Sequence, residues 1–186
     1  SRSLFQPFNR LTISWSGRHT LKTLVGIDGI ALNLDERYYL SLLYVNELLS
    51  LFLPSQESNS EVFILYDAFL HQFDPAFAEV CLREFERAVM DLLGYLPDTG
   101  IEAGQGGAVD AEHYYQFFAD QGLVLCATDA KNAISGQLLI DWNNKRYESS
   151  AVAQLAKTVM RCIIDFNLQG KTLKSRDVFQ QIKRLK

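Results

Sequence analysis

The stretch Arg37 to Leu53 (RYYLSLLYVNELLSLFL) constrains the fold most, because its apolar residues are too many for one face of a helix. A helix that is apolar on nearly every side belongs in the interior of a bundle. A length of about 17 residues also approaches that of a membrane span, but Arg37 and Glu47 argue against one. Pro54 ends the helix, since proline lacks a backbone donor. We predict a buried central helix against which later helices pack, and no membrane partner.

Charge is unevenly distributed along the 186 residues, although the net charge is only −4. Residues 1–34 carry four basic residues and one acid, residues 35–120 carry three basic and sixteen acidic residues, and residues 157–186 carry eight basic and two acidic residues. Basic segments on either side of an acidic centre favour a polyanionic partner. A basic tail that only keeps the chain soluble is the alternative.

The N-terminal part predicts two β-strands. Residues 9–16 alternate apolar and polar side chains, which is the period of a half-buried strand, and residues 19–27 follow after a turn at Gly17. An isolated pair of strands is only marginally stable in water. We therefore expect that this pair belongs to a larger β domain whose earlier strands are not part of the sequence.

The rest of the chain predicts a mainly α-helical domain that contains one small β-hairpin, which gives an α+β fold class. Helix caps, glycine stops and apolar periodicity set the expected boundaries. The expected elements are a helix at 61–73 capped by Ser58, a helix from Asp74–Pro75 to Leu93, a long acidic glycine-rich loop at 97–113, a hairpin at 114–118 and 123–127, a helix at 135–142, a long helix from Ser149 or Ser150 to about Gly170, and a last helix capped by Ser175.

Motifs for catalysis or metal binding are absent from the sequence. The three histidines share no metal-ligand spacing with one another or with a cysteine, and no CxxC, HExxH or phosphate-binding loop occurs. Cys126 has no nearby histidine to activate it, so a buried thiol is a better interpretation than a nucleophile. We expect a protein that is not an enzyme and has neither a metal ion nor a cofactor.

The cysteines and the N-terminal residues bear on the compartment. Cys81, Cys126 and Cys162 are odd in number and widely separated, which suits a reducing interior better than a disulfide framework. No apolar stretch near the first residues resembles a signal peptide. We expect a cytoplasmic protein.

Two groups of basic residues are candidates for binding DNA. Lys171, Lys174 and Arg176 lie in a turn beside a predicted helix start, where backbone N–H groups and cationic side chains can meet phosphates. A turn that only increases solubility is the alternative. The second group lies on a predicted β face beside Trp15, an arrangement that suits single-stranded nucleic acid unless Trp15 belongs to the core with its apolar neighbours. This second group consists of Arg10, Arg18 and Lys22.

Arg83 and Arg87 are candidates for binding a protein partner. They are the only lysine or arginine residues between positions 38 and 130 and lie four residues apart on a predicted helix, where like charges repel. Neighbouring acids such as Glu79 provide a local explanation. The functional alternative is a groove that presents arginine next to apolar side chains and binds an acidic peptide ending in a hydrophobic residue.

Four segments together resemble the bacterial RecO family of recombination mediators. They are LFQPFNRLTISWSG at 4–17, LYVNELL at 43–49, LREFERAVMDLLGY at 82–95 and GKTLKSRDVFQQI at 170–182. The resemblance implies the last strands of an N-terminal OB-fold at 1–31 and a C-terminal helical domain at 32–186. It also implies a bacterial, nucleoid-associated cytoplasmic protein of DNA repair that binds single- and double-stranded DNA and anneals complementary strands.

The same resemblance implies protein partners. They are RecR and the acidic C-terminal tail of single-strand-binding protein, through which the family helps RecA onto coated DNA. The sequence departs from the family in two places. Residues 97–107 lack the four-cysteine zinc site of many relatives, so no zinc is expected, and only two of about five OB-fold strands are visible. A helical interaction scaffold with no nucleic-acid role is the competing interpretation.

Overall fold

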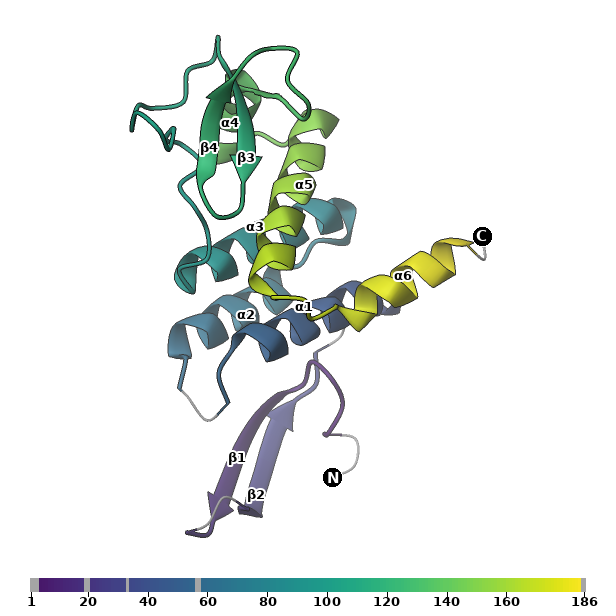
Figure 1. Cartoon of the computed structure of the whole chain (residues 1–186). Helices are drawn as coiled ribbons and strands as arrows, with labels where there is room; N and C mark the ends of the chain where they lie inside the picture. Colours follow the sequence, from purple (N-terminus) through teal and green to yellow (C-terminus); the bar gives the residue numbers. More distant parts are fainter. Residues whose placement is uncertain (1–3, 19–20, 33, 56–57, 185–186) are drawn as a thin grey trace. The chain divides into compact units, whose positions relative to one another are not determined.

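The structure is a computed structural model that describes residues 4–18, 21–32, 34–55 and 58–184. The chain divides into two compact units, Ser1–Tyr39 and Leu40–Lys186. Figure 1 shows the elements of both units.

The first unit contains an antiparallel β-hairpin. Strand β1 (Arg10–Ser16) pairs with β2 (Thr23–Ile30), and the register shifts by one residue between Ser14 and Trp15, which marks a β-bulge. The predicted pair of strands is therefore present, but β2 begins at Thr23 rather than at residue 19; residues 19 and 20 lie outside the described part. Lys22 belongs to the connection, where its ammonium group donates to the carbonyl of Gly17 at 2.9 Å.

Trp15 is not buried within the described residues, so the alternative in which it belongs to a core is wrong for this unit. Trp15 is 59% exposed and Ile13 is 45% exposed. The physical reason is that β1 pairs only with β2 among the described strands, so this sheet has no second layer to bury either face. A 3₁₀ turn, η1 (Glu36–Tyr38), follows the hairpin and is capped by Asp35. Assignment of the hairpin to an OB-fold stays a prediction.

The second unit confirms the α+β class, with helices predominating and one small sheet. The sheet has the strand order β4-β3-β5 with antiparallel pairing, and its β3–β4 hairpin is the predicted one. In chain order the elements are α1 (Tyr39–Phe52), α2 (Ser60–Gln72), the 3₁₀ turn η2 (Pro75–Phe77), α3 (Ala78–Leu92), β3 (Tyr114–Phe118), β4 (Gly122–Cys126), β5 (Ile134–Ser135), α4 (Gly136–Asn143), α5 (Ser150–Asn167) and α6 (Lys174–Arg184).

Helix α5 supplies a large share of the buried core. Its apolar residues recur every three or four positions, so they fall on one face of the helix, as the sequence predicted. Helix α5 packs against α3 and α4. The buried residues are Val152, Leu155, Ala156, Val159, Met160, Ile163 and Ile164.

Helix α1 is only partly the buried central helix that the sequence predicted. Leu42, Val45 and Leu48 are almost completely buried, but Leu43 is 42% exposed and Ser50 is also exposed. Hydrogen bonds join α1 to α2, α3 and α6 through Asn46, Tyr44 and Glu47, and Leu43 and Ser50 stay exposed within this unit. No helix within the described ranges is both long and apolar enough to cross a membrane.

Two predicted helix caps are wrong. Asn59, rather than Ser58, caps α2, and its side-chain oxygen accepts from the Val62 N–H at 3.0 Å. Ser175 does not cap α6, because this helix already begins at Lys174. The acceptor at the start of α6 comes instead from α1, as described below.

The acidic glycine-rich loop at 97–113 has a fixed hydrogen-bonding pattern. The Val109 N–H donates to the Gly100 carbonyl at 2.9 Å, and the Ala103 N–H donates to the Leu123 carbonyl in β4 at 2.7 Å. The Glu102 carboxylate accepts from backbone N–H groups of its own loop, which lowers the pKa of Glu102. The loop is therefore tied to the small sheet.

Candidate partner-binding site

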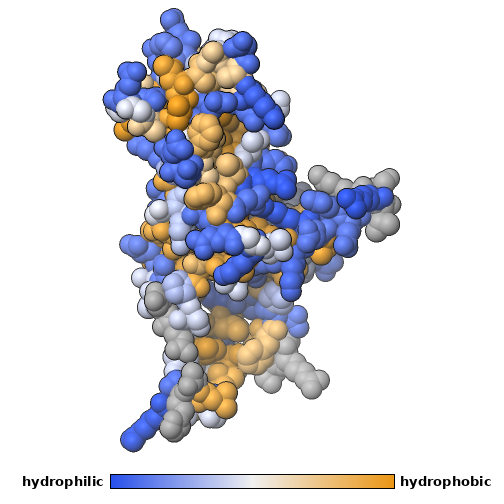
Figure 2. Space-filling view, in the orientation of Figure 1, coloured by the Kyte–Doolittle hydropathy of each residue, from blue (hydrophilic) through white to orange (hydrophobic). Residues whose placement is uncertain are grey.

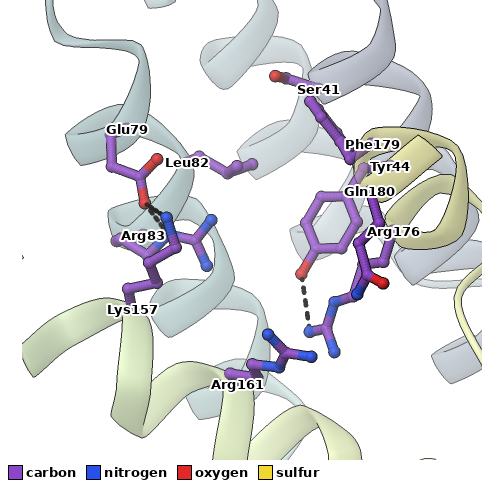
Figure 3. Close-up of a pocket in the computed structure, with 10 residues that line it drawn as sticks. All are labelled: Ser41, Tyr44, Glu79, Leu82, Arg83, Lys157, Arg161, Arg176, Phe179 and Gln180. Carbon is purple, nitrogen blue, oxygen red and sulfur yellow. Dashed lines mark hydrogen bonds and ion pairs between the residues drawn. The ribbon is translucent and has the colours of Figure 1, made fainter. Parts of the chain in front are cut away.

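A concave site of about 330 Å³ lies among α1, α3, α5 and α6 (Figure 3). Helices α1 and α3 are far from α5 and α6 in the sequence, and each of the four contributes at least one side chain. We call this site the four-helix pocket. Its lining residues are Ser41, Tyr44, Glu79, Leu82, Arg83, Lys157, Arg161, Arg176, Phe179 and Gln180.

Four cationic side chains converge on the four-helix pocket. Lys157 and Arg161 lie four residues apart on α5, so they share one face of that helix. Arg83 comes from α3 and Arg176 from α6. Glu79 is the only carboxylate among the lining residues. The pocket is therefore suited to a negatively charged ligand.

Arg83 is the most buried of these cations, with 8% of its surface exposed. Its Nη1 donates to a carboxylate oxygen of Glu86 at 2.6 Å, and its Nε lies 3.5 Å from Glu79. Within the described part of the chain, this Nε has no hydrogen-bond partner. A buried donor without an acceptor costs free energy, so Arg83 has capacity for an additional acceptor.

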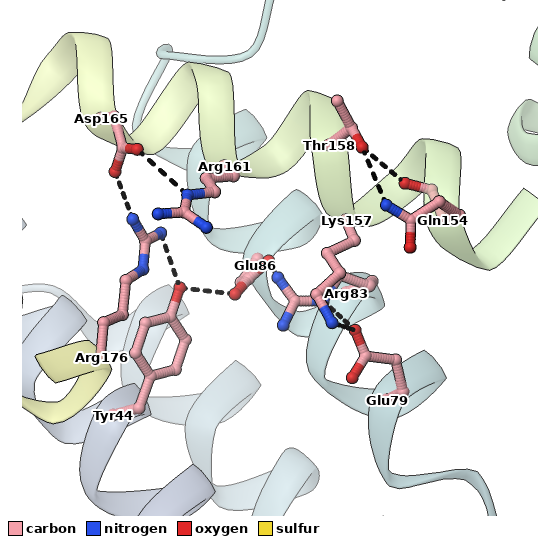
Figure 4. A network of polar contacts seen from close by, with 10 residues as sticks. All are labelled: Tyr44, Glu79, Arg83, Glu86, Gln154, Lys157, Thr158, Arg161, Asp165 and Arg176. Atoms are coloured by element: carbon pink, nitrogen blue, oxygen red, sulfur yellow. Dashed lines mark hydrogen bonds and ion pairs between the residues drawn. The ribbon is translucent and has the colours of Figure 1, made fainter. Parts of the chain in front are cut away.

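Glu86 accepts hydrogen bonds from two residues that line the four-helix pocket, Tyr44 and Arg83 (Figure 4). The Tyr44 hydroxyl donates to Glu86 Oε1 at 2.6 Å, while Arg83 donates to Oε2. Complete burial raises the pKa of Glu86, although the charge of Arg83 and the hydrogen bond from Tyr44 oppose that rise. Burial, together with the charge of Glu86, also raises the pKa of Tyr44, so this phenol stays a neutral donor at physiological pH.

Arg176 connects α6 to both α1 and α5. Its Nη2 donates to the Tyr44 hydroxyl at 3.4 Å, its guanidinium lies 5.6 Å from the centroid of the Tyr44 ring, and its Nη1 pairs with Asp165. Only 19% of the Arg176 side chain is exposed. The residue is thus part of the pocket wall rather than of a loose basic tail.

The start of α6 is held by Glu47 of α1. The Glu47 carboxylate accepts from the backbone N–H groups of Lys174 at 2.8 Å and Ser175 at 2.9 Å, and also from the Ser175 hydroxyl. Burial acts to raise the pKa of Glu47, but these hydrogen bonds outweigh it and hold the pKa below its ordinary value. The first N–H groups of a helix lack intrahelical acceptors. The side chain of Glu47, which belongs to α1, supplies an acceptor to them and so caps α6.

Apolar side chains lie beside the cations in the four-helix pocket. Leu82 and the Tyr44 ring are largely buried, and Phe179 of α6 is half-buried. Figure 3 shows these three side chains on the side of the pocket that α1, α3 and α6 form. A ligand that carries carboxylates next to an apolar group would find both kinds of contact here.

The structure brings together two of the predicted site residues, Arg83 and Arg176. Arg87 has different neighbours: its guanidinium donates to Asn143 Oδ1 at 2.7 Å and lies 4.6 Å from the centroid of the Trp142 ring. It also donates to Thr99 and to the Trp142 carbonyl. Arg87 does not line the four-helix pocket, and a role in partner binding stays a prediction for it.

The other predicted DNA-binding residues lie at several places. Lys171 and Lys174 are exposed at the N-terminal end of α6, and hydrophilic residues cover most of that helix in the view of Figure 2. In the first unit, Arg10 opens β1, whereas Arg18 and Lys22 lie in the connection after its last residue. The structure therefore separates Arg10 from the other two along the strand.

Sequence reasoning missed Lys157 and Arg161. Their spacing of four residues on the polar face of a long amphipathic helix was the available signal. The spacing alone did not show that α3 and α6 add further cations to the same face.

Comparison with known proteins identifies the family. The family model for the C-terminal part of recombination protein O matches residues 34–177. The chain belongs to the recombination protein O (RecO) family. This finding confirms the resemblance that the four sequence segments indicated.

Three relatives carry the name DNA repair protein RecO. The protein from Methylococcus capsulatus is 34% identical over 181 residues, which cover 96% of this chain and 74% of the relative. The Mannheimia succiniciproducens protein is 32% identical over 187 residues (97% and 81%), and the Pasteurella multocida protein is 33% identical over 184 residues (97% and 77%). The similarity thus extends over most of the chain in each case.

No group of three or more histidine, cysteine, aspartate or glutamate side chains within the described ranges could hold a metal ion. The family resemblance implies a zinc site in many relatives within the segment at 97–107. In this chain the Glu102 carboxylate of that segment accepts hydrogen bonds from the backbone N–H groups of Gly104 and Gln105.

Proposed function

We propose that the protein acts in DNA repair as a non-enzymatic recombination mediator. Membership of the RecO family and the shared name of its relatives support a role in repair and recombination. In this proposal the protein binds single- and double-stranded DNA, anneals complementary strands, and works with RecR to help RecA onto DNA coated by single-strand-binding protein.

The four-helix pocket is the observation that carries the partner-binding half of the proposal. Four cations from three helices surround apolar side chains in one cavity, and one of the cations, Arg83, has an unsatisfied donor. An acidic peptide tail that ends in an apolar residue matches this pattern, because its carboxylates pair with the cations while the apolar residue packs on Leu82 and Phe179. The tail of single-strand-binding protein is the proposed ligand.

DNA binding is proposed for exposed basic residues outside the pocket. Lys171 and Lys174 present ammonium groups at the start of α6, and Arg10, Arg18 and Lys22 do so in the first unit. Cationic groups that neutralise phosphates release counterions, so binding would be independent of sequence and would weaken as salt rises. Annealing would follow when two neutralised strands are held close together.

A peptide titration tests the proposed pocket. A fluorescent acidic peptide ending in phenylalanine is titrated against the wild type and against the double variant Lys157→Ala/Arg161→Ala. Loss of two partly exposed cations should weaken binding about tenfold. Lys145→Ala with Arg146→Ala removes two cations that pair with Glu84 and Asp141 and is the matched control. Equal affinity of the pocket variant and the control would place the peptide elsewhere.

A DNA titration tests the second half of the proposal. The double variant Lys171→Ala/Lys174→Ala should bind single-stranded DNA more weakly than the wild type and with a shallower dependence on salt, measured by fluorescence anisotropy. Lys131→Ala, an exposed lysine elsewhere in the second unit, is the control. Absence of DNA binding by the wild type would instead favour the helical scaffold without a nucleic-acid role.

A further inference from the structure

We propose that Glu79 and Asp165 are resident competitors of the acidic ligand in the four-helix pocket. The inference rests on the proposed binding of an acidic peptide there. In it, Glu79, which lines the pocket, and Asp165, which lies beside two of its cations, pair with the cations when no ligand is bound, so they lower the affinity for acidic ligands.

Glu79 bridges two of the pocket cations from the N-terminal part of α3. Its Oε1 lies 3.1 Å from the Lys157 ammonium and 3.5 Å from Arg83 Nε. About half of the Glu79 side chain is exposed. Glu79 therefore holds cations of α3 and α5 at a single carboxylate oxygen, which is also the contact that a ligand carboxylate would make.

Asp165 has the corresponding role on α5 for the other two cations. Its Oδ2 lies 3.5 Å from Arg161 Nε, and its Oδ1 pairs with Arg176 of α6. This side chain is 49% exposed. In Figure 4, dashed lines join Asp165 to Arg161 and Arg176, and Glu79 to its cationic partners. Each cation of the pocket thus pairs with Glu79 or Asp165, and Arg83 pairs with Glu86 as well.

Exposure distinguishes these two carboxylates from Glu86. The carboxylates of Glu79 and Asp165 are about half exposed and can regain water when a ligand replaces them, so a ligand can displace them. Glu86 is completely buried and bonded to Tyr44 and Arg83, so its removal would leave a charge unpaired. Glu86 is therefore a fixed part of the pocket, and Glu79 and Asp165 are the exchangeable part.

Competition of this kind depends on the number of carboxylates that the ligand carries. A ligand with one carboxylate can replace only one resident carboxylate, and the second pair of cations stays occupied. A ligand with several carboxylates can replace both and also keep its apolar end on Leu82 and Phe179. Removal of the resident carboxylates should therefore strengthen the binding of acidic peptides, leave the binding of a neutral peptide nearly unchanged, and so increase the advantage of acidic peptides.

The test uses the full chain with Glu79→Gln, Asp165→Asn and the double variant. Two synthetic peptides ending in phenylalanine, one with three aspartates and one with none, are titrated by anisotropy at fixed salt. Each single variant should bind the acidic peptide about two- to fivefold more tightly than the wild type. Asp91→Asn, an exposed acid of α3 outside the pocket, makes the same change in net charge and should leave the affinity nearly unchanged.

The outcomes separate the inference from the proposed function. Unchanged or weaker binding by both single variants, with a wild type that binds the peptide, would overturn only the role of resident competitor. Absence of binding by the wild type and by all variants would reject the peptide-binding function itself. Far-ultraviolet circular dichroism checks the fold, and because the two substitutions lie on different helices, each one tests the inference independently.

Discussion

Helix α6 depends for its position on a carboxylate that is more than a hundred residues away in the sequence, and Glu47→Gln tests this dependence. Glu47 accepts three hydrogen bonds from the first turn of α6, two of them from backbone N–H groups. Glutamine keeps the shape of the side chain but removes the charge and one acceptor. Loss of an N-cap acceptor costs about 1–2 kcal/mol, and hydrogen bonds to a charged group are at the upper end.

We expect Glu47→Gln to destabilise the docked state of α6 by about 2 kcal/mol, which corresponds to a roughly 30-fold increase in the opening equilibrium of this helix. Native-state hydrogen exchange measures the change directly, because the amides of α6 should exchange faster while those buried in α5 change little. Since Arg176 and Phe179 of α6 line the four-helix pocket, peptide affinity should fall as well.

Glu61→Gln is the matched control for this substitution. Glu61 lies in the first turn of α2, where Asn59 supplies the cap, so its removal changes a charge near a helix start without removing the capping acceptor. Exchange of the α6 amides at the wild-type rate in Glu47→Gln would refute the capping role of Glu47.

Three further predictions follow from buried and hydrogen-bonded groups. Folding lowers the pKa of Glu47, so this carboxylate stabilises α6 fully when the pH is above its unfolded pKa of about 4.3, and the stabilisation disappears as the pH falls through its folded pKa. The difference in α6 amide exchange between wild type and Glu47→Gln should therefore shrink on acidification. A difference that does not change with pH would contradict this. Glu86→Ala leaves Arg83 buried without its partner and should cost about 3–5 kcal/mol in urea unfolding, whereas a loss below about 1 kcal/mol would show that the pair is dispensable. Arg87→Ala removes the hydrogen bonds to Thr99 and Asn143 and should cost about 2 kcal/mol of stability with unchanged peptide affinity; a large loss of affinity in the still-folded variant would place Arg87 at the ligand.

Local sequence signals predicted the elements that depend on neighbouring residues. The buried face of α5 and the β3–β4 hairpin follow from apolar spacing and from a turn at Gly122, which has a φ of 89°. The stop after α3 likewise follows from Gly94, which has a φ of 75°. These features need no knowledge of distant contacts.

Contacts between distant segments were not predictable in the same way. Ser175 was the best local candidate for the cap of α6, but Glu47 of α1 takes that role, because the packing of the two helices brings its carboxylate to the helix start. Arg83 and Arg176 were assigned to separate partners, whereas they line one pocket. The spacing of residues along a sequence predicts which side chains share a face of one helix. It does not predict which helices pack together, and the four-helix pocket depends on the packing of four helices.

The most direct test of the account is hydrogen exchange of the full chain with and without the acidic peptide ending in phenylalanine. We predict slower exchange in the segments that form the four-helix pocket, namely residues 41–44, 79–83, 157–161 and 176–180, and no change in the hairpin at 114–126. Protection confined to the β3–β4 hairpin, or no protection at a saturating concentration of peptide, would contradict it.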